Sequence, residues 1–172
     1  MTARQDLRTR AEDLVARLAA RGMRIVTAES CTGGLIAAFV TDVPGSSAVL
    51  DRGFVTYSNE AKSEMTGVSP ALIAAHGAVS PEVARAMAEG ALAASRAELA
   101  VAVTGIAGPG GGSDAKPVGL VHFGLASGSG TRHVERRFGS LTREEIRHRS
   151  VATAFDLLEE ALQAAGSAEA RP

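Results

Sequence analysis

Hydrophobic residues recur every three or four positions in several stretches of the chain, which is typical of amphipathic helices. Gly22 ends the first stretch. Ser80 and Pro81 start another, because serine caps helix N-termini and proline suits the first turn. Thr142 and Glu145 form a capping-box pattern at the start of the last. The predicted helices cover residues 3–21, 35–40, 60–65 and 81–96, and a segment that begins at 142.

Short apolar runs bounded by turn-forming residues predict strands between these helices. The run over 99–103 is apolar throughout, as in a strand that is buried on both faces of a sheet. Ser127-Gly-Ser-Gly130 separates the last two runs and predicts a hairpin. The predicted strands cover residues 24–27, 49–57, 99–103, 118–126 and 132–138. Strands alternating with helices, plus one hairpin, predict an α/β fold: a single-domain three-layer α/β/α sandwich with a mixed sheet, whose strand order the pattern leaves open.

Length and composition narrow the class of protein. The 172 residues suit one domain, which we expect over residues 1–165, followed by a disordered tail over 166–172. Charged residues make up 22% of the chain and the formal net charge is −1, so nothing favours nucleic-acid binding. No apolar run approaches the roughly 20 residues that span a bilayer, and the polar N-terminus lacks the apolar core of a signal peptide. We therefore expect a cytoplasmic protein that contacts no membrane.

Two glycine-containing loops have the form of ligand-binding turns. The first, Ser30-Cys-Thr-Gly-Gly34, lies between a predicted strand and a predicted helix, where backbone N–H groups can bind a polar or anionic ligand. The second, residues 105–112, follows the buried strand at its carboxyl end, where α/β sheets commonly bind ligands. Neither loop matches a known phosphate-binding glycine pattern, and each is also consistent with an ordinary helix cap or connection.

Lysine is rare in this chain. Of 18 basic residues, only Lys62 and Lys116 are lysines. Arginine stays protonated in proteins, whereas a desolvated lysine can lose its proton and act as a base. Such a role near neutral pH requires the lysine pKa to fall by roughly 3 units. Tyr57 could hydrogen-bond the Lys62 amine, and Ser47 could be the nucleophile of a Ser–Lys pair; a surface lysine on a short helix is the alternative.

Other candidate groups have a structural explanation beside the chemical one. Cys31 could be a thiolate nucleophile at a helix start, or a small buried apolar residue. Glu29 could bind ribose hydroxyls, act as a base, or make an ordinary structural hydrogen bond. Ser113 and Lys116 have the spacing of an S-x-x-K motif, but glycines before them and Pro117 after them indicate a loop. The four histidines are scattered along the sequence, and we expect no metal site.

Three segments carry a family resemblance when they are taken together: Thr27-Ala-Glu-Ser-Cys-Thr-Gly-Gly34, Pro44-Gly-Ser-Ser47 with Tyr57-Ser-Asn-Glu-Ala-Lys62, and Val103-Thr-Gly-Ile-Ala-Gly-Pro-Gly110. In this order they resemble the CinA C-terminal domain family, over residues 7 to 163. Stand-alone members of that family are nicotinamide-nucleotide amidases (NMN deamidases, PncC type). Other members carry an N-terminal pyrophosphatase-like domain and are known as competence- or damage-associated proteins.

The resemblance implies hydrolysis of the carboxamide of nicotinamide mononucleotide to nicotinate mononucleotide and ammonia. It implies a Ser–Lys mechanism with Ser47 as nucleophile, Lys62 as base and Tyr57 nearby, and it requires no metal or cofactor. The choice of Ser47 rests on the resemblance alone. The residues by themselves leave three other serines open as the nucleophile: Ser30, Ser46 and Ser58.

The same resemblance implies that the two glycine-containing loops hold the phosphate and ribose of a nucleotide substrate, with an arginine as charge partner. The expected substrate-binding residues are Ser30, Thr32, Gly33, Gly34, Thr104, Gly105, Ala107, Gly108, Arg137 and Arg143. A non-catalytic nucleotide-binding or interaction module of the same fold is the alternative. We also expect a homodimer or a higher homo-oligomer, with the helix over 81–96 and the terminal helices as candidate surfaces.

Overall fold

A five-stranded mixed sheet forms the centre of the protein. The structure, a computed structural model, describes residues 3–169. The strands lie in the order β2-β1-β3-β4-β5; β2, β1 and β3 run parallel, and β4 is antiparallel to both of its neighbours. The strand bounds are β1 Ile25–Glu29, β2 Leu50–Val55, β3 Leu99–Gly105, β4 Leu120–Ser127 and β5 Gly130–Arg137. The predicted mixed sheet and the predicted hairpin are confirmed.

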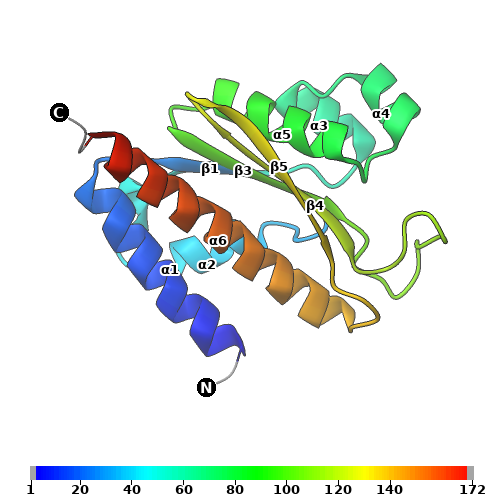
Figure 1. Cartoon of the computed structure of the whole chain (residues 1–172), viewed down its shortest axis with the longest axis horizontal. Coiled ribbons are helices and arrows are strands. Elements are labelled where there is room, and N and C mark those ends of the chain that lie inside the picture. Colours follow the sequence, from blue (N-terminus) through cyan, green and yellow to red (C-terminus); the bar gives the residue numbers. More distant parts are fainter. Residues whose placement is uncertain (1–2, 170–172) are drawn as a thin grey trace.

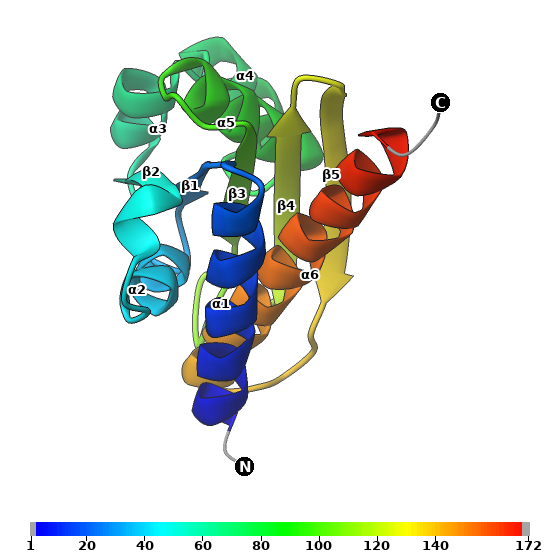
Figure 2. The same cartoon turned by 90° about the vertical axis from the view of Figure 1, so that its left-hand side faces the viewer.

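Helices cover both faces of this sheet (Figure 1). One face carries α1 (Ala3–Ala20), α2 (Leu35–Thr41) and α6 (Arg143–Glu169), and the other carries α3 (Asn59–Thr66), α4 (Pro70–His76) and α5 (Pro81–Ala93). Figure 2 shows α1 and α6 side by side across the front of the strands, with α3, α4 and α5 behind the sheet. A short 3₁₀ helix, η1 (Ser46–Ala48), precedes β2. The predicted three-layer α/β/α sandwich is confirmed.

Side chains of the central strands alternate between two apolar clusters. On β3, Val101 and Val103 belong to the cluster with α1, α2 and α6, whereas Ala100 and Ala102 belong to the cluster with α5. All four side chains are fully buried. The continuous apolar run therefore comes from a strand covered on both faces, as predicted.

Small residues on α5 let this helix approach the sheet and α3 closely. Ala84, Ala88 and Ala91 are fully buried. A Cβ atom on Gly90 would lie 1.6 Å from the carbonyl oxygen of Thr66, at the end of α3, so this position has no room for a side chain. The buried alanines of α5 are thus used for packing within the chain. The expected homo-oligomer stays a prediction.

The hydrophobic pattern missed α4 and ended α6 too early. Ser69 and Pro70 have the residue types of a helix start, but seven residues are too few to show a helical period. The helix α6 continues to Glu169 and so includes the first four residues of the tail expected over 166–172, whose disorder stays a prediction. The rest of that tail lies outside the described residues. No helix within residues 3–169 is long and apolar enough to cross a membrane.

Candidate active site

The loops that follow β1 and β2 begin side by side at the carboxyl end of the sheet. Ser30 directly follows β1, and its N–H donates to the carbonyl of Val103 on β3 (2.9 Å). The N–H of Thr56, after β2, donates to the carbonyl of Glu29 (2.9 Å). The chain then leaves β1 toward α2 on one face and leaves β2 toward α3 on the other. Such a divergence of loops is the usual position of a ligand site in an α/β sheet.

Lys62 is buried at this end of the sheet. It lies in the first turns of α3, which Ser58 caps by accepting the N–H of Ala61 on its hydroxyl oxygen (3.0 Å). The side chain of Lys62 is only 1% exposed. Its Nζ donates to the carbonyl of Thr56 (2.8 Å) and lies 3.1 Å from Oγ of Ser30. The structure therefore places the lysine that the sequence singled out against the serine that directly follows β1.

The surroundings of the Lys62 amine suit its neutral form. Burial lowers the pKa of Lys62, because an ammonium ion loses its hydration there. A neutral amine has two N–H donors and one lone pair. The carbonyls of Thr56 and Ser58 (3.5 Å) can accept from the two donors, and the Ser30 hydroxyl can donate to the lone pair. This is the arrangement of a base and a nucleophile.

Ser47 lies at the opposite end of the sheet from Lys62. It belongs to η1, which precedes β2, whereas Lys62 follows β2. The six residues of β2 span about 20 Å, at about 3.3 Å per residue. The hydrogen-bond partners of Lys62 Nζ are Ser30, Thr56 and Ser58. The predicted pairing of Ser47 with Lys62 is therefore wrong, because a whole strand separates the two residues.

Tyr57 stands at the rim of this site. Its side chain is 58% exposed, and it lies between the two residues whose carbonyls accept from Lys62. Its hydroxyl accepts a hydrogen bond from Nη2 of Arg143 (2.9 Å), and Nη1 of Arg143 donates to the carbonyl of Gly108 (2.8 Å). Arg143 thus ties the start of α6 to the loops that follow β2 and β3. Of the two arginines expected as charge partners, this one reaches the site.

Arg137 and Thr104 are engaged elsewhere. Arg137 lies on the edge strand β5, three places from β1 in the sheet order, and it donates to Glu135 (2.7 Å). The structure does not bring it to Lys62. The hydroxyl of Thr104 donates to the carbonyl of Ala78 (2.8 Å), which joins β3 to the segment before α5. The other expected residues of this loop continue from the end of β3: Gly105, Ala107 and Gly108.

The turn that follows Ser30 has a backbone that favours glycine. Gly33 and Gly34 have φ angles of 60° and 92°, in the left-handed region. A Cβ atom on Gly34 would also come within 3.3 Å of the Val55 side chain. The two glycines let the chain turn sharply from β1 into α2. Ser30 therefore stays at the mouth of the turn, where it is partly exposed.

The structural alternatives for Glu29 and Cys31 describe these residues correctly. The Glu29 carboxylate is fully buried and accepts the N–H groups of Ile36 and Ala37 (both 2.9 Å). It therefore accepts two of the free N–H groups in the first turn of α2, whose N-cap residue is Gly34. Burial raises the pKa of Cys31 to about 12, so its thiol is protonated at neutral pH. A buried, protonated thiol is a poor nucleophile.

Arg147 is a residue of this site that the sequence analysis missed. Its Nη2 donates to the carbonyl of Thr32 (2.9 Å) and lies 3.8 Å from where a Cβ atom on Gly33 would be. Its Nε is buried without a hydrogen-bond partner within the described part of the chain, and so is Oγ1 of Thr32. The signal that could have found it is the i, i+4 spacing from Arg143, which puts both arginines on one face of a helix.

Two of the histidines that are scattered in the sequence meet in the fold. The hairpin brings Nδ1 of His122 within 2.9 Å of Nε2 of His133, and Oε2 of Glu135 lies 4.0 Å from the same His122 nitrogen. Burial lowers the pKa of both histidines. Within residues 3–169, no group of three or more His, Cys, Asp or Glu side chains is placed to hold a metal ion.

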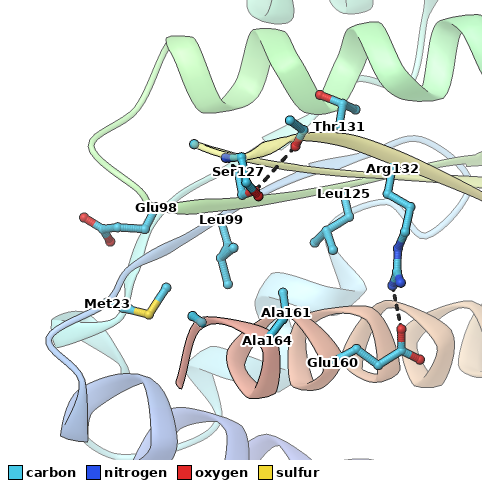
Figure 3. Close-up of a pocket in the computed structure, with 14 residues that line it drawn as sticks. Met23, Glu98, Leu99, Leu125, Ser127, Thr131, Arg132, Glu160, Ala161 and Ala164 are labelled. Carbon is cyan, nitrogen blue, oxygen red and sulfur yellow. Dashed lines mark hydrogen bonds and ion pairs between the residues drawn. The ribbon is translucent and has the colours of Figure 1, made fainter. Parts of the chain in front are cut away.

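A cleft of about 630 Å³ lies at the other end of the sheet, beside the start of β3 (Figure 3). Leu99 and Leu125 line it on the sheet side, and α6 lies opposite. Arg132 and Glu160 border it and form an ion pair (2.6 Å). The lining contains no lysine, histidine or cysteine. This cleft therefore has room for a ligand, and its lining contains hydroxyl side chains but no buried amine like that of Lys62. A smaller hollow of about 450 Å³ lies between α3 and α4.

Comparisons with known sequences cover most of the chain. The family model of the CinA C-terminal domain matches residues 7–162. A CinA-like protein of Anaeromyxobacter sp. (strain Fw109-5) is 55% identical over 150 residues, and one of Mycobacterium marinum is 57% identical over 152 residues. These matches cover 87% and 88% of this chain but 36% and 35% of the relatives. The chain thus spans about a third of their length.

Solved structures show the same fold. The competence/damage inducible protein CihA from Agrobacterium tumefaciens has a TM-score of 0.89 at 52% identity, over 92% of this chain and 96% of that one. A CinA superfamily protein from Klebsiella pneumoniae has a TM-score of 0.87 at 35% identity, over 92% of this chain and 98% of that one. The sheet and helices described above are therefore those of CinA superfamily structures.

Proposed function

This chain belongs to the CinA C-terminal domain family, and we propose that it hydrolyses the carboxamide of nicotinamide mononucleotide to nicotinate mononucleotide and ammonia. The observation that carries the proposal is the distance of 3.1 Å between Lys62 Nζ and Ser30 Oγ. A module that only binds a nucleotide has no need of a desolvated lysine against an accessible serine. A serine nucleophile beside a neutral lysine base is a pair that can hydrolyse an amide.

Ser30 is the nucleophile in this proposal. Neutral Lys62 takes the proton of the Ser30 hydroxyl as Oγ forms a bond to the carboxamide carbon. Ser30 is partly exposed whereas Lys62 is buried, so the substrate reaches the oxygen while the base stays shielded from water. The candidate donors to the oxyanion that forms are the backbone N–H groups of the turn over residues 31–34, except that of Gly33, which donates to the Ser30 carbonyl (3.0 Å).

The C–N bond breaks in the next step. Protonated Lys62 returns its proton to the departing nitrogen, which leaves as ammonia. Water then attacks the ester on Ser30, again with Lys62 as base, and this releases the nicotinate nucleotide and restores the hydroxyl. Tyr57 is the second candidate proton donor to the leaving group, because Arg143 holds its hydroxyl at the rim of the site.

Ammonia release from nicotinamide mononucleotide by the purified protein tests this proposal. We expect Lys62→Arg to lower kcat by at least about 10³-fold, because arginine keeps the charge but cannot act as the base. Cys31→Ser is the control on the same loop, and its rate should stay within about threefold of wild type because the thiol takes no part.

Two results would count against the proposal in different ways. A wild-type protein that releases no ammonia at high enzyme concentration would overturn the reaction and favour a nucleotide-binding module. Full activity in Lys62→Arg would overturn the Ser–Lys mechanism and leave the reaction standing.

A further inference from the structure

The first turns of α6 direct two guanidinium groups at the loops around Ser30. Arg143 donates to the carbonyl of Gly108 and to the hydroxyl of Tyr57. Arg147, one turn later, donates to the carbonyl of Thr32 (2.9 Å). All of these acceptors are neutral, so none of them balances the positive charge of an arginine.

Neither guanidinium has a carboxylate within ion-pair distance among residues 3–169. Seven other arginines within residues 3–169 have such partners, whereas Arg85, Arg96 and Arg149 do not; the paired ones are Arg8, Arg10, Arg17, Arg24, Arg52, Arg132 and Arg137. Glu29, the buried carboxylate directly before Ser30, accepts the N–H groups at the start of α2 instead. The rim of the site therefore carries two positive charges without a counter-ion, which favours an anionic ligand.

Two hydrogen-bond donors of this rim are also unused. Nε of Arg147 and Oγ1 of Thr32 are both buried, and in the described structure neither has a hydrogen-bond partner. The Thr32 residue is fully buried. Buried polar groups without partners destabilise a fold and are rare in native proteins. A ligand rich in acceptor oxygens would satisfy them.

We propose that Arg147, with Arg143 and Thr32, binds the phosphate of the substrate, where the identity of the substrate rests on the proposed function. A guanidinium fork donates two parallel hydrogen bonds to phosphate oxygens, and a phosphate dianion balances two arginines. Thr32 is two residues from Ser30, so the phosphate lies near the nucleophile without occupying its place. The site therefore selects a phosphorylated amide over the same amide without phosphate.

A pair of substrates that differ only in the phosphate tests this assignment: nicotinamide mononucleotide and nicotinamide riboside. We expect Arg147→Met to lower kcat/KM for the mononucleotide by about 10²-fold, mainly through KM, because charged hydrogen bonds are lost. The riboside should change by less than about threefold. Arg149→Met is the matched control on an exposed position of the same helix, and it should affect neither substrate. An equal loss on both substrates, or no loss on the mononucleotide, would overturn the assignment.

Binding without turnover separates this inference from the proposed function. Calorimetry of inorganic phosphate and of nicotinate mononucleotide should show weaker binding to Arg147→Met than to wild type. If the wild type hydrolyses neither amide but binds phosphate through Arg147, the proposed function fails and the phosphate site stands. If both proteins bind these probes equally, the phosphate site fails. Should Arg147→Met not fold, Arg147→Lys gives the same readout with a smaller loss, since lysine keeps the charge without the fork.

Discussion

The two ends of the parallel strands differ in how their polar groups are satisfied. At the amino ends, Arg132 and Glu160 pair with each other beside a roomy cleft. At the carboxyl ends, Lys62 is buried against Ser30 with a lowered pKa, and Arg147 has no counter-ion among residues 3–169. The larger cleft therefore lies at the amino ends, whereas the desolvated amine and the unbalanced charge lie at the carboxyl ends, to which we assign the reaction.

Strand direction explains this asymmetry. β1, β2 and β3 are parallel, so the loops that follow them meet at one end of the sheet. Those loops carry Ser30, Tyr57 and Gly108, and α6 begins close enough to reach them with Arg143. Ser47 precedes a strand instead of following one, and it therefore falls at the other end.

The largest expected effect comes from removing one serine hydroxyl at each end of the parallel strands, which tests the comparison between the two ends. Ser30→Ala should lower kcat for ammonia release by at least about 10³-fold, because it removes the nucleophile. Ser47→Ala should keep the rate within about threefold of wild type. A larger loss in Ser47→Ala than in Ser30→Ala would reverse the assignment of the reactive end.

Lys62→Met tests whether the buried amine at the carboxyl ends serves activity or stability, because the two should change in opposite directions or independently. The variant should be inactive, yet its free energy of unfolding at pH 7 should match or exceed that of wild type by on the order of 1 kcal/mol, since a buried amine is replaced by an apolar side chain.

The pH dependence of that difference has a definite sign. The folded-state pKa of Lys62 is lowered, so the wild type gains stability as pH rises toward the unfolded-state value of 10.5. The advantage of Lys62→Met should therefore shrink with rising pH in denaturant titrations. A marked destabilisation at every pH would show that the amine stabilises the fold.

The histidine pair makes the β4–β5 side of the sheet sensitive to acid. The pKa values of His122 and His133 are lowered in the fold, so the unfolded chain binds more protons as pH falls below about 6.5. Stability should therefore be lost as pH falls. We expect the Tm from circular dichroism to drop by roughly 2–4 °C between pH 7 and pH 5. His122→Gln should flatten this slope, and an unchanged slope would contradict the account.

The smallest effect is expected at the cleft beside the start of β3, which Arg132 and Glu160 border. Arg132 and Glu160 are about half exposed, and such surface ion pairs contribute about 0–1 kcal/mol. Arg132→Gln should therefore change the free energy of unfolding by a few tenths of a kcal/mol, and the rate of ammonia release by less than about twofold. A loss of activity in this variant comparable to that of Lys62→Arg would show that the amino ends of the strands, and not the carboxyl ends, carry the reaction.

The sequence predicted the fold well where local patterns determine it. The apolar run over 99–103 gave the buried strand, and the turn at Ser127 gave the hairpin, because both depend on neighbouring residues. Strand order does not, and neither does α4, which is too short for a helical period. The end of α6 was missed because its last residues are small and polar, as in a tail.

The candidate site was predicted only in part, because sequence shows local features but not contacts between residues far apart in the chain. Lys62 stood out by its rarity, and the structure shows it buried at the carboxyl end of the sheet. Its partner depends on which strand ends meet, so neither sequence distance nor the family resemblance selected Ser30 over Ser47. Arg147 reaches the site only because α6 packs across the sheet, a contact between residues far apart in the chain.

Trapping the covalent intermediate tests the central claim most directly. Protein quenched in acid during turnover of nicotinamide mononucleotide can be digested after acidic residues, so that cleavage at Asp42 puts Ser30 and Ser47 in different peptides. Mass spectrometry should then find the nicotinate nucleotide ester on the peptide that contains Ser30, and no ester in Ser30→Ala. An ester on the peptide that contains Ser47, or a thioester on Cys31, would contradict the account.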